Sequence, residues 1–234
     1  SELAPDVIRY DLKQKCYLLA GEKTYFTYDV DQALYSLAGE RAIAIDTEHA
    51  KRLPNWVDTS IKRRVPVSLA STITRCIFQH QKITADYTSV SSGPRERPLS
   101  PLALIHDGLR WHIRCFDHER EEFRDYNLSR FRSVDASDKS NVTLDLDTEW
   151  NNEVNLRLVP HPKSAHPEAI YWDYDMRNNE KNITLKACLV GYFLRHWHID
   201  FSNTGSGNPR AQQLYLDNKD ELLVQGVPSW AFKE

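Results

Sequence analysis

The sequence predicts an α+β fold, because one amphipathic helix is followed by a run of short strands and then by alternating strands and helices. Apolar and polar residues alternate through 82–135, which is typical of antiparallel strands joined by turns. One helix and about five strands in 66–135 favour a small, strongly bent sheet or barrel. After residue 153, the order strand, helix, strand, helix favours a small ferredoxin-like module.

The first 65 residues predict less regular structure. The pattern at 7–19 reads as a β-hairpin around a polar turn. A lone hairpin is barely stable in water, so it should pack on another element. Asp29 or Asp31 can cap a helix that ends near Leu37, and the mixed composition beyond it indicates a linker. We therefore expect a hairpin in residues 1–24 and a helical linker in 25–65.

The clearest helix is predicted over 66–79. Leu69, Ile73 and Cys76 recur at helical spacing on one face, and Ser68 can cap the first turn. Strands should follow at 82–89, at 99–105, twice within 109–130, and once more through residue 134.

The stretch 91–98 is predicted to be a turn or flexible loop, because Gly93, Pro94 and Pro98 interrupt it. The polar stretch 136–141 predicts a domain boundary, so the barrel domain should cover 66–136 and a C-terminal domain 137–234. In that second domain we expect strands at 155–159 and 181–186, helices at 168–176 and 188–197, and a short segment at 214–216.

Composition bounds the class of protein. The chain has 234 residues and a formal net charge of −3, so no global basic field draws it to nucleic acid, and any anion site must be local. The four cysteines lack C-x-x-C spacing and read as small buried hydrophobes in a reducing compartment. No signal peptide opens the sequence, and no apolar run approaches the ~20 residues of a membrane span, so we expect a cytoplasmic protein without membrane contact.

The stretch Leu109–Arg130 carries the candidate site. Side chains alternate along its first strand, so His112 and Arg114 share one face, and Trp111 and Ile113 share the other. We expect Trp111 and Ile113 to point inward and the two cationic residues to face a ligand.

Further polar side chains extend this set. Arg124 and Arg130 follow on the next strand, and Tyr87 and Ser89 belong to an earlier one. Arginine forks match phosphate or carboxylate, and tyrosine adds a stacking face, as nucleotide sites use. The alternative is a solvated sheet face with ordinary ion pairs, which spacing alone slightly favours.

Other clusters predict no chemistry. His196 and His198 should be structural residues near a helix end, because nothing completes a metal site. Asp145, Asp147 and Glu149 form an acidic stripe, which we expect to be a solvated face. No catalytic motif is present, so we predict no enzyme activity, no metal and no cofactor.

A family resemblance adds to this interpretation. The segment PLALIHDGLRWHIRCFDHEREEFRDYNLSRF resembles the core of a WYL domain, although the naming triplet is here Trp111, His112 and Ile113. The pattern WHxR followed by FRD-x-x-LSR resembles WYL regulators found with bacterial phage-defence systems of the BREX and CBASS kinds. RLVPHPK at 157–163, DYDM at 173–176 and ACLVGYFLRHWHID at 187–200 resemble the C-terminal extension of that subfamily, called WCX. IRYDLKQKCYL at 8–18 resembles the wing hairpin of its winged helix-turn-helix domain.

The resemblance implies a transcriptional regulator, generally a repressor. Its WYL domain would be an Sm-like β-barrel that senses a nucleotide or oligonucleotide effector, and its C-terminal domain would form a homodimer. The family's ligand face would correspond to Tyr87, Ser89, His112, Arg114, Arg124 and Arg130. Operator DNA would bind through a winged helix domain that is largely absent from this chain, so the chain should sense and dimerise but bind operator poorly. The alternative function is a protein-protein interaction module that uses the same basic face without a small ligand.

Overall fold

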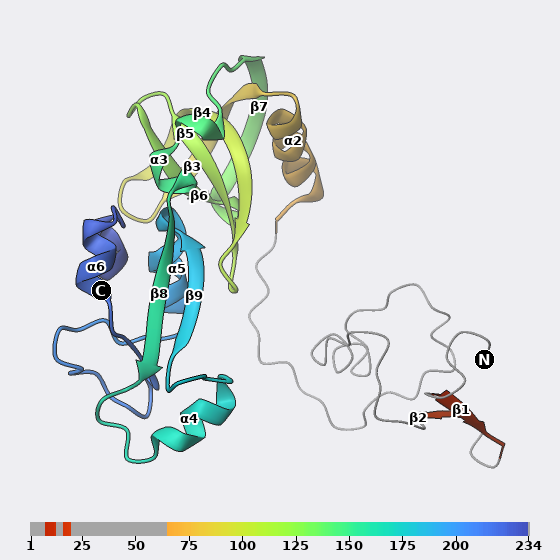
Figure 1. Ribbon diagram of the computed structural model, residues 1–234. Coiled ribbons are helices and arrows are strands. Elements are labelled where there is room, and N and C mark those ends of the chain that lie inside the picture. The colour runs from red at the N-terminus through yellow and green to blue at the C-terminus, as the bar shows by residue number, and fades with distance from the viewer. Residues whose placement is uncertain (1–7, 13–15, 20–64, 234) are drawn as a thin grey trace. The chain divides into compact units, whose positions relative to one another are not determined.

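The computed structural model describes residues 8–12, 16–19 and 65–233 (Figure 1). The chain divides into two compact units, 1–61 and 62–234. Of the first unit, the structure describes strands β1 (Ile8–Asp11) and β2 (Cys16–Leu19), which pair antiparallel and confirm the hairpin. The helix expected between Asp29 or Asp31 and Leu37 lies outside the described residues.

The second unit begins with helix α2 (Val67–Phe78) and a five-stranded antiparallel sheet. The strands are β3 (Gln81–Ser89), β4 (Gly93–His106), β5 (Trp111–Asp117), β6 (Glu122–Asn127) and β7 (Phe131–Lys139). Their order in the sheet is β6-β5-β4-β3-β7, and the short helix η1 (Leu128–Arg130) joins β6 to β7. β6 is therefore an edge strand, which matters for the site.

Helix α2 covers the sheet through the face that its sequence predicts. Leu69, Ile73 and Cys76 are buried in one apolar cluster with Ile83, Leu99 and Ile113 from the strands. The predicted cap at Ser68 is wrong. The helix begins after Pro66, whose fixed backbone angle sets the start, and no side chain caps it.

The turn or loop predicted at 91–98 is confirmed only at 91–92, because Gly93 already opens the long strand β4. In that first part β4 pairs with β3, whereas its pairing with β5 begins only at Leu99. Pro94 and Pro98 therefore lie where one side of the strand is an open edge, and an edge tolerates a residue without a backbone N–H.

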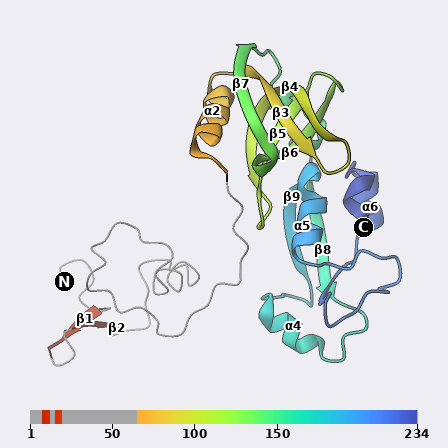
Figure 2. The same cartoon turned by 180° about the vertical axis from the view of Figure 1, so that it is seen from behind.

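The C-terminal part holds a second antiparallel sheet of three strands in the order β10-β8-β9. Its elements are η2 (Leu144–Leu146), α3 (Thr148–Asn151), β8 (Glu153–Pro160), α4 (Pro167–Asp173), β9 (Lys181–Lys186), η3 (Ala187–Leu189), α5 (Val190–His196), β10 (Leu214–Leu216), α6 (Lys219–Val224) and η4 (Ser229–Phe232). The predicted order of strands and helices is confirmed, and Figure 2 shows α5 lying against β8 and β9.

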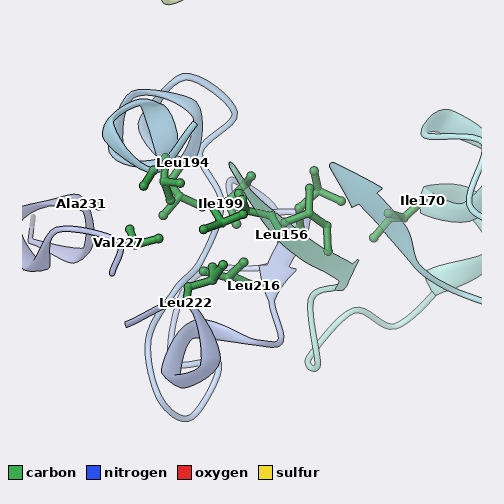
Figure 3. Packing of buried hydrophobic residues seen from close by; sticks show 13 residues of the cluster. Leu156, Ile170, Leu194, Ile199, Leu216, Leu222, Val227 and Ala231 are labelled. Atoms are coloured by element: carbon green, nitrogen blue, oxygen red, sulfur yellow. The ribbon is translucent and has the colours of Figure 1, made fainter. Parts of the chain in front are cut away.

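A separate apolar core fills this C-terminal part (Figure 3). Leu156 from β8, Leu194 from α5 and Leu216 from β10 meet there, each essentially without exposure. The α+β class is thus confirmed with two cores, one for each sheet. The domain boundary placed at residue 136 stays a prediction, since β7 continues to Lys139.

The three cysteines whose burial the structure describes fit the expectation of small buried residues. Cys76, Cys115 and Cys188 are buried without a disulfide, and burial raises the pKa of the Cys188 thiol to about 12. Such thiols stay protonated and are poor nucleophiles. No helix among the described residues is long and apolar enough to cross a membrane.

Candidate ligand site

The register of β5 and β6 divides the predicted site residues between two faces of the sheet. Arg114 lies opposite Asp125, and Cys115 lies opposite Arg124. Cross-strand partners share a face and successive residues alternate, so Arg114 and Arg124 point to opposite sides. We call the face of Arg114 the outer face and the face of Cys115 the inner face.

On the outer face, Arg114 is enclosed by carboxylates. Only 2% of the residue is exposed. Its Nε and Nη2 donate to the two carboxylate oxygens of Asp147 at 2.7 and 3.0 Å. Nη2 also donates to Glu149 at 3.1 Å and Nη1 to Asp125 at 3.3 Å. All three guanidinium nitrogens of Arg114 therefore donate hydrogen bonds to carboxylates within the protein.

Asp147 holds the segment after the sheet against this face. The prediction of a solvated acidic stripe at Asp145, Asp147 and Glu149 is wrong for Asp147, which is buried. Its Oδ1 also accepts a hydrogen bond from the Trp150 backbone N–H, which caps α3. One carboxylate thus fixes both the guanidinium and the start of the C-terminal part.

One arginine serves three carboxylates here, and the titration behaviour reflects it. Burial raises the pKa of Asp125, and the charge of Arg114 offsets this only in part. Burial would lower the pKa of Arg114, but its hydrogen bond to Asp147 and the charge of Asp125 raise it, so the guanidinium stays charged. The Tyr192 hydroxyl from α5 donates a further hydrogen bond to Asp125.

His112 is also closed off on the outer face. Its Nε2 lies 2.8 Å from Asp107 Oδ2, and its ring packs on Tyr192 with centroids 4.7 Å apart. Burial lowers the pKa of His112, although the hydrogen bond to Asp107 opposes the shift. His112 is therefore neutral at pH 7 and adds no positive charge.

The expectation that both Trp111 and Ile113 point into the core is half right. Ile113 is fully buried, but Trp111 is 48% exposed and packs on the His106 ring at 4.7 Å. The two residues share a face, yet Trp111 begins its strand at the edge of the core.

On the inner face, at the mouth of the bent sheet, a cavity of about 180 Å³ opens. It is lined by Tyr87, Ser89, Ser91, Ser92, Arg97, Arg120, Arg124, Asp125, Tyr126 and Arg130. Four of the six predicted site residues thus lie together here, namely Tyr87, Ser89, Arg124 and Arg130. Arg114 and His112 do not line this cavity.

The floor of the cavity is a rigid aromatic layer. The rings of Tyr87 and Tyr126 meet edge to face at 5.0 Å. The Tyr126 hydroxyl donates to the fully buried Asp117, and the Tyr87 hydroxyl accepts from the Asn127 backbone N–H at 3.2 Å. The Tyr87 proton has no acceptor among the described residues and remains available to a ligand.

Two cations of the cavity have unused capacity. Arg97 is 3% exposed and donates through Nη1 to Glu119 at 2.9 Å, but its buried Nε–H has no acceptor among the described residues. Arg130, which ends η1, has no ion pair or hydrogen bond within the described part of the chain. By contrast, Arg124 pairs with Glu122.

A serine turn completes the wall. Ser89 Oγ lies 3.0 Å from Ser91 Oγ and accepts from the Ser91 backbone N–H at 3.2 Å. The sequence did not predict Arg97, Ser91 or Ser92 as site residues, because the stretch 91–98 was expected to be a turn or flexible loop. The signal that could have found Arg97 is its pairing with Ala85, which puts it on the same face as Tyr87. No group of three metal-ligating side chains occurs in the described residues.

Arginine, tyrosine and serine side chains thus meet around one cavity in the sheet of β3–β7. Two protein-family models match this chain. A WYL domain matches residues 68–136, and the C-terminal dimerization domain of the BrxR transcriptional regulator matches residues 153–222.

Named relatives carry the comparison further. The DNA-binding transcriptional repressor CapW of Stenotrophomonas maltophilia is 30% identical over 230 residues, which are 94% of this chain and 77% of the relative. CapW of Escherichia coli is 29% identical over 236 residues, and CapW of Pseudomonas aeruginosa is 33% identical over 168. This chain spans 77% of the Escherichia relative and 56% of the Pseudomonas one.

The chain therefore belongs to the family of CapW-like, WYL-domain transcriptional repressors, which are not enzymes. The resemblance stated from the sequence is confirmed. Among solved structures, the match to proteasome accessory factor B/C of Arthrobacter aurescens covers 94% of this chain and 37% of the chain of that protein. The sequence identity is 14% and the TM-score is 0.32, so this likeness is weak.

Proposed function

We propose that this chain is the ligand-sensing and dimerising part of a DNA-binding transcriptional repressor of a phage-defence system. In this proposal an anionic nucleotide or oligonucleotide binds the inner-face cavity and alters operator binding. The match to a dimerization domain and the names of the repressor relatives support a homodimer and operator DNA as partners. We also propose a cytoplasmic location, where such DNA is found.

One observation carries the ligand proposal: the buried Arg97 Nε–H lacks an acceptor among the described residues, and Arg97 lines the same cavity as the unpaired Arg130. Buried donors are almost always hydrogen-bonded, and leaving one unpaired costs about 1–3 kcal/mol. A phosphate oxygen supplies both the missing acceptor and the charge that Arg130 lacks.

The size of the cavity limits what enters it. Its volume of about 180 Å³ is below the ~300–1,000 Å³ of sites that enclose a whole small molecule. We therefore propose that a phosphate and its sugar enter, while the rest of the ligand extends outside. The revised ligand set is Tyr87, Ser89, Arg124 and Arg130 with Arg97 and the Ser91 and Ser92 hydroxyls. Arg114 and His112 support it from the outer face.

We retain the finer fold assignments as proposals: an Sm-like barrel for the sheet of β3–β7 and a ferredoxin-like module for the C-terminal part. β6 and β7 are the ends of the sheet order, and no described pairing joins them. If the sheet closes into a barrel, side-chain contacts would have to join β6 to β7 in place of backbone hydrogen bonds.

The test of the ligand proposal is a fluorescence anisotropy titration of the chain with a labelled short single strand of deoxyadenosines. Arg130→Ala should weaken binding about tenfold or more, because a hydrogen bond to a charged group contributes about 1.5–3 kcal/mol. Arg132→Ala is the matched control, since Arg132 is exposed on β7 and lies outside the cavity.

Affinity should also fall with added salt, and the slope should be shallower in Arg130→Ala. Absence of binding, or equal loss in both variants, would contradict the proposed site.

A further inference from the structure

We infer a second subsite, which stacks a nucleobase, on the outer face of β6. It rests on the proposed function, because it extends the binding of the same nucleic-acid ligand across the edge of the sheet. The observation behind it is a cavity of about 300 Å³ that adjoins the phosphate cavity. Both cavities share Arg124 and Asp125 as lining residues.

Three of the eight residues that line this second cavity are aromatic, and the other five are charged. Phe123 comes from β6, Tyr192 from α5 and Trp230 from η4. The rings of Tyr192 and Trp230 meet at 5.5 Å, which fixes their orientation. Phe123 and Trp230 are only partly buried, so ring surface faces the cavity. Aromatic side chains beside a cationic track are the usual platform for bases of a single strand.

A ligand can reach both cavities because β6 is the edge strand of its sheet. The phosphate cavity lies on the inner face of β6, and Phe123 and Asp125 lie on the outer face, where Phe116 and Arg114 are their partners. For a strand inside the sheet, the neighbouring strand would block this path. At the edge strand β6, a chain of nucleotides can pass from one face to the other, and the half-exposed Arg124 lines both cavities on this path.

The charges around the aromatic cavity do not oppose a nucleic acid. Of its carboxylates, Asp125 and Glu149 are held by Arg114, and Glu122 is held by Arg124. Arg195, which does not itself line the cavity, lies 5.4 Å from the centre of the Trp230 ring and adds positive charge next to it. The cavity therefore accepts an uncharged base whose phosphates stay with Arg124 and Arg130.

The test compares two ligands on the unaltered chain: a short single strand of deoxyadenosines and a strand of the same length that lacks bases. The base-bearing strand should bind about tenfold or more tightly, since stacking of one base contributes on the order of 1–3 kcal/mol. Phe123→Ala should remove this difference. Phe78→Ala is the matched control, because Phe78 is an exposed phenylalanine on α2 and should leave it intact.

The outcomes separate the two proposals. If both strands bind equally and Arg130→Ala weakens both, the phosphate cavity stands and the base subsite is wrong. If neither strand binds, the proposed function fails together with the subsite. If the difference persists in Phe123→Ala, the base stacks elsewhere and the inference is overturned.

Discussion

Arg114 and Arg124 are the same residue type on neighbouring strands, yet they occupy opposite environments. The side chain of Arg114 is 2% exposed and is shared among buried carboxylates, whereas that of Arg124 is 44% exposed and pairs with the half-exposed Glu122. The first holds the C-terminal part against the sheet. The second stands at the rim of two cavities. Residue type alone therefore does not separate a structural arginine from a binding one.

The physical reason lies in desolvation. A buried ion pair gains little over an apolar pair, but removal of one partner leaves an uncompensated buried charge. An exposed pair is screened by water and easily exchanges its partner for a ligand phosphate. Substitution of the buried Arg114 is thus predicted to change stability, and substitution of the half-exposed Arg124 is predicted to change binding.

The largest expected effect comes from Arg114→Met. It leaves Asp147 and Asp125 buried without their cation, so the free energy of unfolding should fall by about 3–5 kcal/mol. Arg124→Met is the matched variant and should change it by at most about 1 kcal/mol, because its ion pair is half-exposed. Urea unfolding followed by tryptophan fluorescence measures both.

Similar losses of stability in the two variants would contradict the distinction between a structural Arg114 and a ligand-binding Arg124. The distinction is supported if Arg124→Met weakens binding of the single strand while its unfolding curve stays close to that of the unaltered chain.

A smaller effect concerns pH and His112. Burial lowers the pKa of His112 in the folded chain, so between that lowered value and about 6.5 the unfolded chain binds a proton that the folded chain does not. The free energy of unfolding should therefore decrease as the pH falls below about 6.5. His112→Gln should make this decrease shallower.

Some pH dependence should remain in that variant, because burial and the charge of Lys82 also lower the pKa of His118. His166→Gln, at an exposed histidine, is the control and should leave the profile unchanged. An unchanged profile in His112→Gln would mean that His112 is solvated, as a ligand-facing residue would be.

The sequence predicted the elements better than the site. Periodicity located α2 and most strands, because Leu69, Ile73 and Cys76 bury one helical face whatever surrounds them. The proline-containing start of β4 was missed, since only the pairing of strands reveals that it is an open edge. Four of the six predicted site residues, including Tyr87 and Arg130, line one cavity.

The placement of Arg114 and His112 could not be predicted from alternation. Alternation says that they share a face, but not which residues pack over that face. Asp147 covers Arg114 and Tyr192 covers His112, and both are distant in sequence. The sequence around Asp147 predicts only a solvated acidic stripe, and that around Tyr192 predicts only a helix. Alternation also does not say whether Arg124 shares the face of Arg114, because this depends on the register of β6 with β5.

The most direct test of this account is an NMR titration that follows the Nε–H signals of the arginine side chains while a short single strand of deoxyadenosines is added. The account predicts that the signals of Arg97 and Arg130 shift on binding, because their donors gain a phosphate acceptor. The Arg114 Nε–H stays bonded to Asp147 at 2.7 Å, so its signal should shift less than those of Arg97 and Arg130. A shift of Arg114 without shifts of Arg97 and Arg130 would show that the ligand does not place its phosphate in the inner-face cavity, which is the opposite of what we propose.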